Sequence, residues 1–469
     1  MTRIDRLAIA VLVVLAAAMY AAVGLLRHWH FGSSAFDLGI FDQVVWHLSR
    51  FERPSSSIRG VANIFGDHFH PILALFVPVF WLVPAAESLI VAQACLLALS
   101  VVPVFVYLRG RLPRGPSVVL ATSYALFWAL QRTAEFDVHE LAFAPLLIAT
   151  MILAIDRGRW RLFWGAGVLL ALVKEDLLPV LACFGVYLMW RGERVRGAAL
   201  ALSGLAAFLV VLRVVIPFFG SGVGYGYVDT YAHLIREPWL AFRALVEPPI
   251  KLVTIVSWLA PFAFLSLGSP LVLLAVPLVL ERFLSASPYH WGPSFHYSAP
   301  LAPILVMSAG DTLGRIARRI EAAARPSGRT VGALVGTCLV VSAFVPGHLP
   351  HWKLLSPAPY RFTSFERSGA RAIAMIPPTA SVVAQASVVP HLSHRDRIYM
   401  LDARAPDAEF VVAAADTSPW PAADPAAVLV WLAERRQRGY EVVFEENGWL
   451  VLRHPQALQP SFHGTAPTS

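Results

Sequence analysis

The chain is poor in charge. Only 14% of its 469 residues are charged, where a soluble domain carries about 25%, and 57% are hydrophobic. A compact soluble protein has too little interior to bury so much apolar surface. The composition therefore excludes a soluble enzyme with one core, a disordered chain and a nucleic-acid-binding arm. A multi-spanning membrane protein remains.

Cysteine and nucleotide-binding motifs are scarce or absent. Cys95, Cys183 and Cys338 each lie inside an apolar run, where a thiol behaves as a small hydrophobic group. This excludes a disulfide framework and a cysteine-based metal site. The sequence also has no G-x-x-x-x-G-K-[ST] loop and no Gly-rich dinucleotide fingerprint, which argues against ATP-driven transport.

Long apolar runs predict about eleven membrane spans in a polytopic α-helical domain over residues 1–350. The first run, 7–26, has 20 residues without a charge, which is long enough to cross a bilayer core and longer than a signal-peptide core. The further runs are 88–108, 117–131, 141–155, 162–173, 177–190, 197–212, 252–267, 270–280, 298–309 and 331–346.

Four arginine-rich loops set the orientation. They lie at 109–114, 157–161, 191–196 and 315–329, and the positive-inside rule places all four in the cytoplasm. The stretch 162–190 must then be a hairpin with Lys174, Glu175 and Asp176 at its outer tip. The stretch 252–280 must also reverse, at Gly268-Ser269-Pro270. The N-terminus is predicted inside the cell and the C-terminus outside.

All fifteen histidines fall outside or at the outer interface in this topology, so we expect the chemistry on the outer face. A long first outer loop covers 27–70. Within it, 36–51 predicts an amphipathic surface helix, and Asp37 shares the apolar stripe with Ile40, Phe41, Val44 and Leu48. We expect Asp42 to face water. The proline-rich run 71–84 is predicted to be re-entrant or interfacial.

The composition changes near Ser356, which predicts an extracytoplasmic α/β domain over 356–457. Thr363 and Glu366 form a capping box that opens a helix to about Ile376. Strands are expected at 380–385, 397–402 and 408–415, and Asp424-Pro425 opens a second helix. Asn447-Gly448 predicts a hairpin turn between 440–446 and 449–453. Residues 458–469 are expected to be a disordered tail.

Charged residues between apolar runs usually mark function. Lys174, Glu175 and Asp176 are the sharpest such feature, although a salt-bridged hairpin tip would also explain them. Asp67, His68 and His70, completed by Asp137 and His139 with Glu135 and Glu140 nearby, are candidate ligands for Zn²⁺, Mn²⁺ or Mg²⁺. The alternative is a loop whose polar groups face water. His290, Trp291, His296 and Tyr297 either line a sugar or lipid-head site or form an aromatic interface belt.

Several motifs carry a resemblance. They are 36–43 (FDLGIFDQ), 66–71 (GDHFHP), 173–176 (VKED), 295–297 (FHY) and 389–395 (VPHLSHR). With them the chain resembles a family of bacterial polytopic proteins of unknown function (domain of unknown function, number 2079), whose architecture is similar to that of GT-C glycosyltransferases. The similarity covers nearly the whole chain.

The resemblance implies an inverting transfer of sugar from a polyprenyl-phosphate donor to an outer glycan or protein acceptor. Asp37 then takes the place of the first-loop general base. Lys174, at a hairpin tip, and Arg213, at the outer end of its span, would contact the lipid phosphate. Glu175, Asp176, His296 and Tyr297 would belong to the same substrate site. In many GT-C enzymes the acids form a loose pair, and here Asp37 and Asp42 are five residues apart. Asp37 as a helix N-cap is the alternative.

Two other classes of function stay open. One is a transporter or lipid-linked-sugar flippase that uses 174–176 as a charge relay near the bilayer midplane. The other is a non-catalytic envelope assembly protein that presents the C-terminal domain. A cavity shared by Lys174-Glu175-Asp176, Asp37 and Asp67 would favour a reaction site. A two-sided cavity near the midplane would favour transport.

Overall fold

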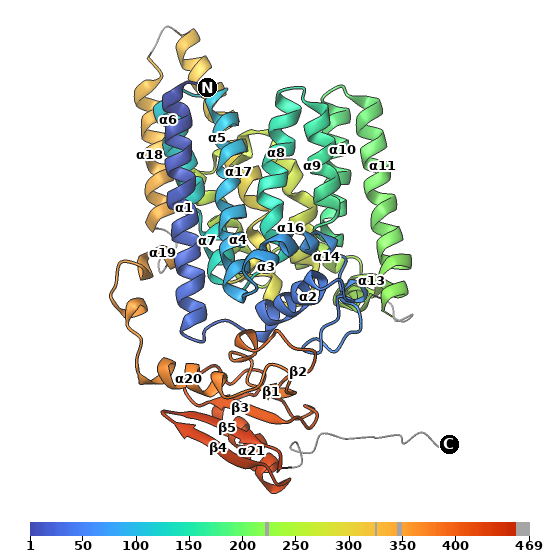
Figure 1. Ribbon diagram of the computed structural model, residues 1–469. Coiled ribbons are helices and arrows are strands. Elements are labelled where there is room, and N and C mark those ends of the chain that lie inside the picture. The colour runs from blue at the N-terminus through green and yellow to red at the C-terminus, as the bar shows by residue number, and fades with distance from the viewer. Residues whose placement is uncertain (221–224, 324–325, 345–348, 456–469) are drawn as a thin grey trace.

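The computed structural model describes residues 1–220, 225–323, 326–344 and 349–455. It is mostly helical, with one small sheet near the C-terminus. Figure 1 shows the long helices side by side, the N-terminus at one end of them and the sheet beyond the other end. The predicted tail at 458–469 lies outside the described residues.

Most helices of the first half of the helical domain overlap the predicted apolar runs, one of which, 117–131, is divided between two helices. The helices are α1 (Arg3–Trp29), α4 (Ala86–Leu99), α5 (Val101–Arg109), α6 (Arg114–Ala125), α7 (Trp128–Glu135), α8 (Phe143–Asp156), α9 (Trp160–Ala171), α10 (Leu178–Trp190), α11 (Arg194–Val210), η6 (Val211–Val215) and α12 (Ile216–Phe219). Short 3₁₀ turns η4 (Glu140–Ala142) and η5 (Glu175–Leu177) connect α7 to α8 and α9 to α10.

The second half of the helical domain is more broken. Its elements are η7 (Gly226–Tyr231), α13 (Ala232–Arg236), α14 (Leu240–Ala244), α15 (Ile250–Leu259), η8 (Ala260–Phe262), η9 (Leu265–Gly268), η10 (Pro270–Ala275), α16 (Val276–Leu284), η11 (Pro288–His290), η12 (His296–Ser298), α17 (Leu301–Ala322), α18 (Gly328–Phe344) and α19 (Pro350–Lys353). The stretch 252–280 breaks first at Ala263 and Phe264, which have left-handed backbone angles, and then again at the predicted Gly268-Ser269-Pro270.

Three helices of the described chain are long and apolar enough to cross a membrane alone. They are Arg3–Trp29, Ala86–Arg109 and Arg194–Phe219. Shorter apolar helices lie at Pro71–Leu82, Trp160–Ala171, Ile250–Phe262 and Gly328–Phe344. The count of about eleven spans therefore stays a prediction.

The basic loops gather at the N-terminal end of the helical domain. Asp5 accepts a hydrogen bond from Arg114 at 2.7 Å, and Arg111 pairs with Asp156 at 2.7 Å. The reversal at 268–270 reaches the same end, because the Ser269 hydroxyl donates to Asp311 at 2.7 Å and Arg315 donates to the Gly268 carbonyl at 2.5 Å. These contacts place the reversal at the same end of the helices as Arg111 and Arg114, whereas the C-terminal sheet lies beyond the other end (Figure 1). Which end faces the cytoplasm stays a prediction.

The first outer loop lies between the helical domain and the C-terminal sheet (Figure 1). Its elements are η1 (Ala35–Gly39), α2 (Ile40–Ser49), η2 (Ile64–Gly66), η3 (Pro71–Phe76) and α3 (Val77–Leu82). The predicted surface helix is thus shorter than 36–51. The run 71–84 folds against α2, since the Trp81 indole donates to the Ser49 carbonyl at 2.8 Å.

The C-terminal elements match the expected pattern closely. They are η13 (Ala358–Tyr360), α20 (Ser364–Ala374), β1 (Val382–Ala384), η14 (Val389–His391), β2 (Ile398–Met400), β3 (Phe410–Ala414), α21 (Pro425–Gln437), β4 (Glu441–Glu446) and β5 (Trp449–Arg453). Thr363 and Glu366 form the capping box, and Asp424 caps α21. The sheet order is β2-β1-β3-β5-β4, with β1 parallel to β2 and β3, and β5 antiparallel to β3 and β4.

The C-terminal domain is docked onto the loop that carries Asp37. The Ala35 amide donates to the Ala386 carbonyl at 2.7 Å, and the Gln43 side chain donates to the Arg395 carbonyl at 2.8 Å. Asp42 is only 1% exposed, accepts a hydrogen bond from the Ser393 hydroxyl and lies 2.9 Å from His394 Nε2. The expectation that Asp42 faces water is therefore wrong, because a distant segment covers that face of α2.

Glycines allow α10 and α11 to pack closely. A Cβ on Gly185 would meet the Ala201 amide nitrogen and lie 2.5 Å from the Gly197 carbonyl oxygen. Small residues at a helix crossing permit this approach in membrane proteins. Gly165 in α9 offers a contrast, because a Cβ there meets nothing within 4 Å.

We predict that Gly185→Ala destabilises the protein by about 1–3 kcal/mol through overpacking. The expected result is a lower midpoint of thermal unfolding in detergent. Gly165→Ala is the matched helical control and should leave the midpoint unchanged or raise it slightly, since alanine favours the helix. Equal midpoints for the two variants would contradict the close crossing.

Candidate functional site

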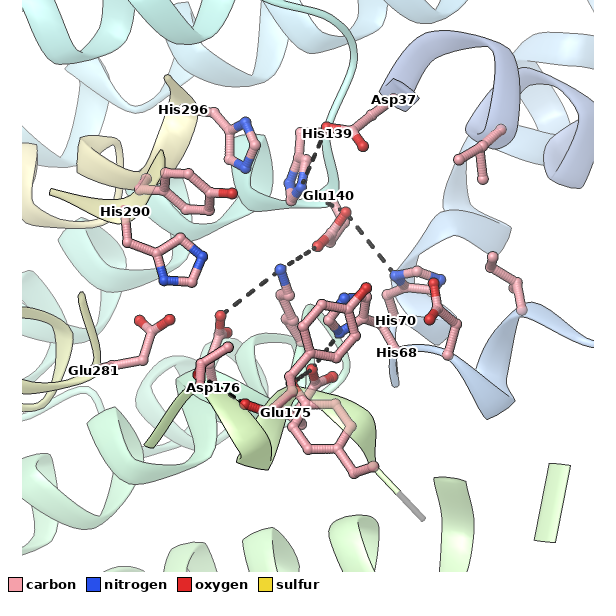
Figure 2. Close-up of a pocket in the computed structure, with 18 of the residues that line it drawn as sticks. Asp37, His68, His70, His139, Glu140, Glu175, Asp176, Glu281, His290 and His296 are labelled. Carbon is pink, nitrogen blue, oxygen red and sulfur yellow. Dashed lines mark hydrogen bonds and ion pairs between the residues drawn. The ribbon is translucent and has the colours of Figure 1, made fainter. Parts of the chain in front are cut away.

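A cavity of about 480 Å³ lies where the outer loops meet the helix ends. Figure 2 shows Asp37, His139 and His296 along one edge, Asp176 and Glu175 along the opposite edge, and Glu140 between them. Its walls come from separate parts of the chain, including the first outer loop, the 139–140 segment, the 174–176 tip, η7 and the 288–297 loop. The tip residues Lys174, Glu175 and Asp176 therefore share one cavity with Asp37 and Asp67, as a reaction site requires.

Asp37 sits in η1, immediately before α2. The N-cap of η1 is Ser34, whose hydroxyl accepts the Phe36 amide, so the cap position belongs to Ser34. The Asp37 side chain is 24% exposed, and its Oδ2 lies 3.8 Å from His139 Nε2. Burial, together with the nearby Glu140 and Asp137 carboxylates, raises the pKa of Asp37 to about 7. The carboxyl group can thus exchange a proton near neutral pH.

Glu175 joins the hairpin tip to the first outer loop. His68 Nδ1 lies 2.5 Å from its Oε1, the Phe69 amide donates to Oε2 at 2.8 Å, and the Tyr225 hydroxyl donates to Oε1 at 2.7 Å. Burial alone would raise the pKa of Glu175, but the charge and the hydrogen bond of His68 lower it below the usual range. The pKa of His68 is raised in turn, because Glu175 outweighs the effect of burial. The two side chains form a buried ion pair.

Lys174 lies beside the acids of the cavity and is only 8% exposed. Its Nζ is 3.5 Å from Glu140 Oε1 and 3.8 Å from Asp176 Oδ2. Burial opposes its charge, yet these two carboxylates raise the pKa of Lys174, so it stays protonated. Burial raises the pKa of Glu140 to about 7 and that of Asp176 to about 6 despite Lys174.

Acids outnumber permanent cations on the cavity walls. The carboxylates are those of Asp37, Asp67, Glu140, Glu175, Asp176 and Glu281, and the permanent cations are Arg59 and Lys174. Isolated buried carboxylates are costly unless they are paired, protonated or bound to a metal. The cavity is therefore suited to hold protons or a cation.

One compact group on the walls has the donors of a divalent-cation site. A carboxylate oxygen of Asp37 and ring nitrogens of His139 and His296 all lie within 4.8 Å of one another. His296 is 3% exposed, and neither of its ring nitrogens has a hydrogen-bond partner in the described chain. Imidazole with carboxylate suits Zn²⁺ or Mn²⁺.

The predicted metal set does not converge on one point. Asp67 is bonded by Arg59 at 2.8 and 2.9 Å, Asp137 is held by Arg27 at 2.5 Å, and His68 is paired with Glu175. Asp137 is also outside the cavity walls. His70 and His139 do line the cavity, and both ring nitrogens of His70 lack a hydrogen-bond partner among the described residues. The sequence placed the right loops together but assigned the wrong partners, because spacing does not show which acid meets an arginine.

The other predicted site residues fall into two groups, those that line the cavity and those that do not. His290, His296 and Tyr297 line the cavity, whereas Arg213 is exposed and absent from its walls. Arg213 lies in η6, and its contact with the lipid phosphate stays a prediction. Arg59, Tyr225, Tyr227 and Glu281 line the cavity and were missed. Only their outer position could have signalled them, since none belongs to a charged motif.

We predict that Asp37→Asn stabilises the fold in a pH-dependent way. The folded-state pKa of about 7 exceeds the unfolded value of about 3.9, so the folded state binds the proton more tightly and wild type loses stability as pH rises between these values. The advantage of the asparagine should grow from pH 4 to pH 7 and stay constant above. Thermal unfolding of both proteins over this range measures it, with the exposed Asp229→Asn as control. A pH-independent difference would contradict the assigned environment of Asp37.

Comparison with solved structures finds a protein of similar fold. The chain is similar to ArnT from Cupriavidus metallidurans bound to undecaprenyl phosphate, with a TM-score of 0.51, 14% identity, and coverage of 94% of this chain and 97% of that one. The apo state of the same protein gives a TM-score of 0.52 at 14% identity, covering 93% and 97%. At this identity the likeness shows the fold alone. No curated protein matches the sequence.

The family comparison covers most of the chain. A family model described as "Predicted membrane protein (DUF2079)" matches residues 27–451. This range includes the first outer loop, the walls of the cavity and nearly all of the C-terminal sheet. The resemblance to this family inferred from the motifs is therefore confirmed: the chain belongs to this family of predicted membrane proteins, and its fold is similar to that of ArnT.

Proposed function

We propose that the protein is a GT-C-like membrane glycosyltransferase that uses a polyprenyl-phosphate-linked sugar donor at the outer face of the cell membrane. The observation that carries this proposal is the single cavity shared by Asp37 and Lys174-Glu175-Asp176. The similar fold of ArnT, solved with undecaprenyl phosphate, supports a lipid phosphate as partner. The acceptor would be an outer glycan or a protein.

Asp37 is the proposed general base. An acceptor hydroxyl would attack the anomeric carbon, the bond from that carbon to the phosphate oxygen would break, and the phosphate would leave with the electron pair. The hydroxyl proton would pass to Asp37. A carboxylate with a pKa of about 7 is suited to this step, because proton transfer is most effective when the pKa of the base is near the working pH. Inversion at the anomeric carbon follows from one direct displacement.

Lys174 is the proposed contact for the donor phosphate. It is a buried, protonated amine whose partners in the free protein are Glu140 and Asp176 at 3.5 and 3.8 Å. Both acids have a raised pKa, so they can take up protons when an anion binds beside them. A divalent cation held by His139 and His296 would supply further positive charge to the leaving phosphate, while Asp37 stays free to act as the base.

The outer placement of the cavity rests on the distribution of arginine. The basic loops lie at the end of the helices opposite to the cavity and the C-terminal domain, and the positive-inside rule assigns that end to the cytoplasm. Flippase or transport activity is the rival function. The position of 174–176 among loops, next to Asp37 and Asp67, supports a reaction site over a relay at the midplane.

Asp37→Asn should lower sugar transfer by at least 100-fold, since a positioned general base contributes about 10²–10⁴ to the rate. The assay uses membranes supplied with polyprenyl-phosphate sugars, and the exposed Asp229→Asn is the matched control. Wild-type kcat/KM should rise with pH and level off above about 7, because only the ionised Asp37 accepts the proton. Undiminished transfer by Asp37→Asn would remove this residue from the mechanism.

Lys174→Gln should weaken binding of undecaprenyl phosphate at least tenfold, because a charge-assisted contact to the phosphate is lost. Lys174→Arg keeps the charge and should restore most of the affinity. Binding is measured on purified protein in detergent, with undecaprenol as the uncharged control lipid. If Lys174→Gln binds undecaprenyl phosphate as tightly as wild type, the phosphate lies elsewhere.

A further inference from the structure

A second group of potential metal ligands lies at the end of α2 that is farther from Asp37. Ligand atoms of His47, Glu52 and Asp396 all lie within 4.8 Å of one another. His47 is in the last turn of α2, Glu52 follows that helix, and Asp396 belongs to the C-terminal domain. None of the three lines the cavity described above. The group therefore bridges two parts of the chain that are far apart in sequence.

The surroundings leave this group open to a cation. His47 is 6% exposed, and its Nδ1 lies 2.9 Å from Glu52 Oε2. Arg50 donates to the other oxygen, Glu52 Oε1, at 2.9 Å. Asp396 is exposed and makes no ion pair with any residue in the described part of the chain. Glu52 Oε2 and the Asp396 carboxylate thus face His47 without a permanent cation between them.

Two carboxylates brought this close across a domain contact repel each other. Arg50 pairs with Glu52 alone, and a divalent cation between the two carboxylates would neutralise both. One imidazole nitrogen with two carboxylate oxygens is a donor set suited to Zn²⁺, which takes three protein ligands and a water in a tetrahedral arrangement.

Only a small movement of these side chains would be needed to bind Zn²⁺. Ligand atoms around a tetrahedral Zn²⁺ stand about 3.4 Å apart, given metal–ligand distances of about 2.0–2.2 Å. The His47 and Glu52 atoms are already closer than this. Asp396 and Glu52 are exposed, so their side chains can rotate without disturbing the packing.

We propose that His47, Glu52 and Asp396 form a divalent-cation site, best suited to Zn²⁺, that ties the end of α2 to the C-terminal domain. The first turn of α2 is already held there by Asp42 with His394, and η1 before it by the Ala35–Ala386 hydrogen bond. With the cation, the helix that follows Asp37 is fixed to the C-terminal domain at both ends. The site does not depend on the proposed transferase activity.

The test uses the full chain in detergent, stripped of metal with a chelator. Because Asp37, His139 and His296 can also bind metal, the titrations are made in a His296→Gln background. Isothermal titration with ZnCl₂ should show one site, and Asp396→Asn and His47→Gln should each weaken it at least tenfold. Asp416→Asn, which removes an exposed carboxylate elsewhere in the same domain, should not change it.

A second measurement reports the domain contact itself. Zn²⁺ should raise the unfolding midpoint and slow hydrogen exchange at 393–398, and both effects should disappear in Asp396→Asn. Zinc binding that is the same in all three variants would overturn the proposal. An unfolding midpoint that does not change when zinc is added would also overturn it.

Discussion

The cavity depends on the buried pair of His68 and Glu175. Glu175 is 1% exposed and accepts hydrogen bonds from His68, from the Phe69 amide and from Tyr225. An unpaired carboxylate at this depth would cost several kcal/mol. The first outer loop and the 174–176 tip must therefore meet for either to be buried, and their meeting encloses the space between Asp37 and Lys174.

The same low-dielectric setting gives the remaining acids their chemical character. Glu175 is fixed in its ionised form by its donors, whereas Asp37 and Glu140 have few donors and a pKa of about 7. Similar side chains thus acquire different roles from their surroundings, one as a structural anion and others as groups that exchange protons. Lys174 shares this environment and remains charged because acids face it.

Helix α2 links this chemistry to the C-terminal domain. The helix begins three residues after Asp37, and one of its faces packs on the helical domain. The other face holds Asp42, Gln43 and His47 against the segment after η14. The domain is therefore not an appendage to the membrane helices. It covers polar side chains of the first outer loop that would otherwise have to face water.

Much of the fold was determined by local sequence. Apolar runs, arginine loops, the Thr363–Glu366 box and the Asn447-Gly448 turn each specify structure through interactions within a few residues, and the described helices and strands fall on them. The outer loops that form the site could likewise be identified from their charges. The partners of the charged side chains could not be identified from the sequence in this way. Asp42 is buried and Asp67 meets Arg59, because the solvation of a charged side chain is decided by whichever distant segment packs over it.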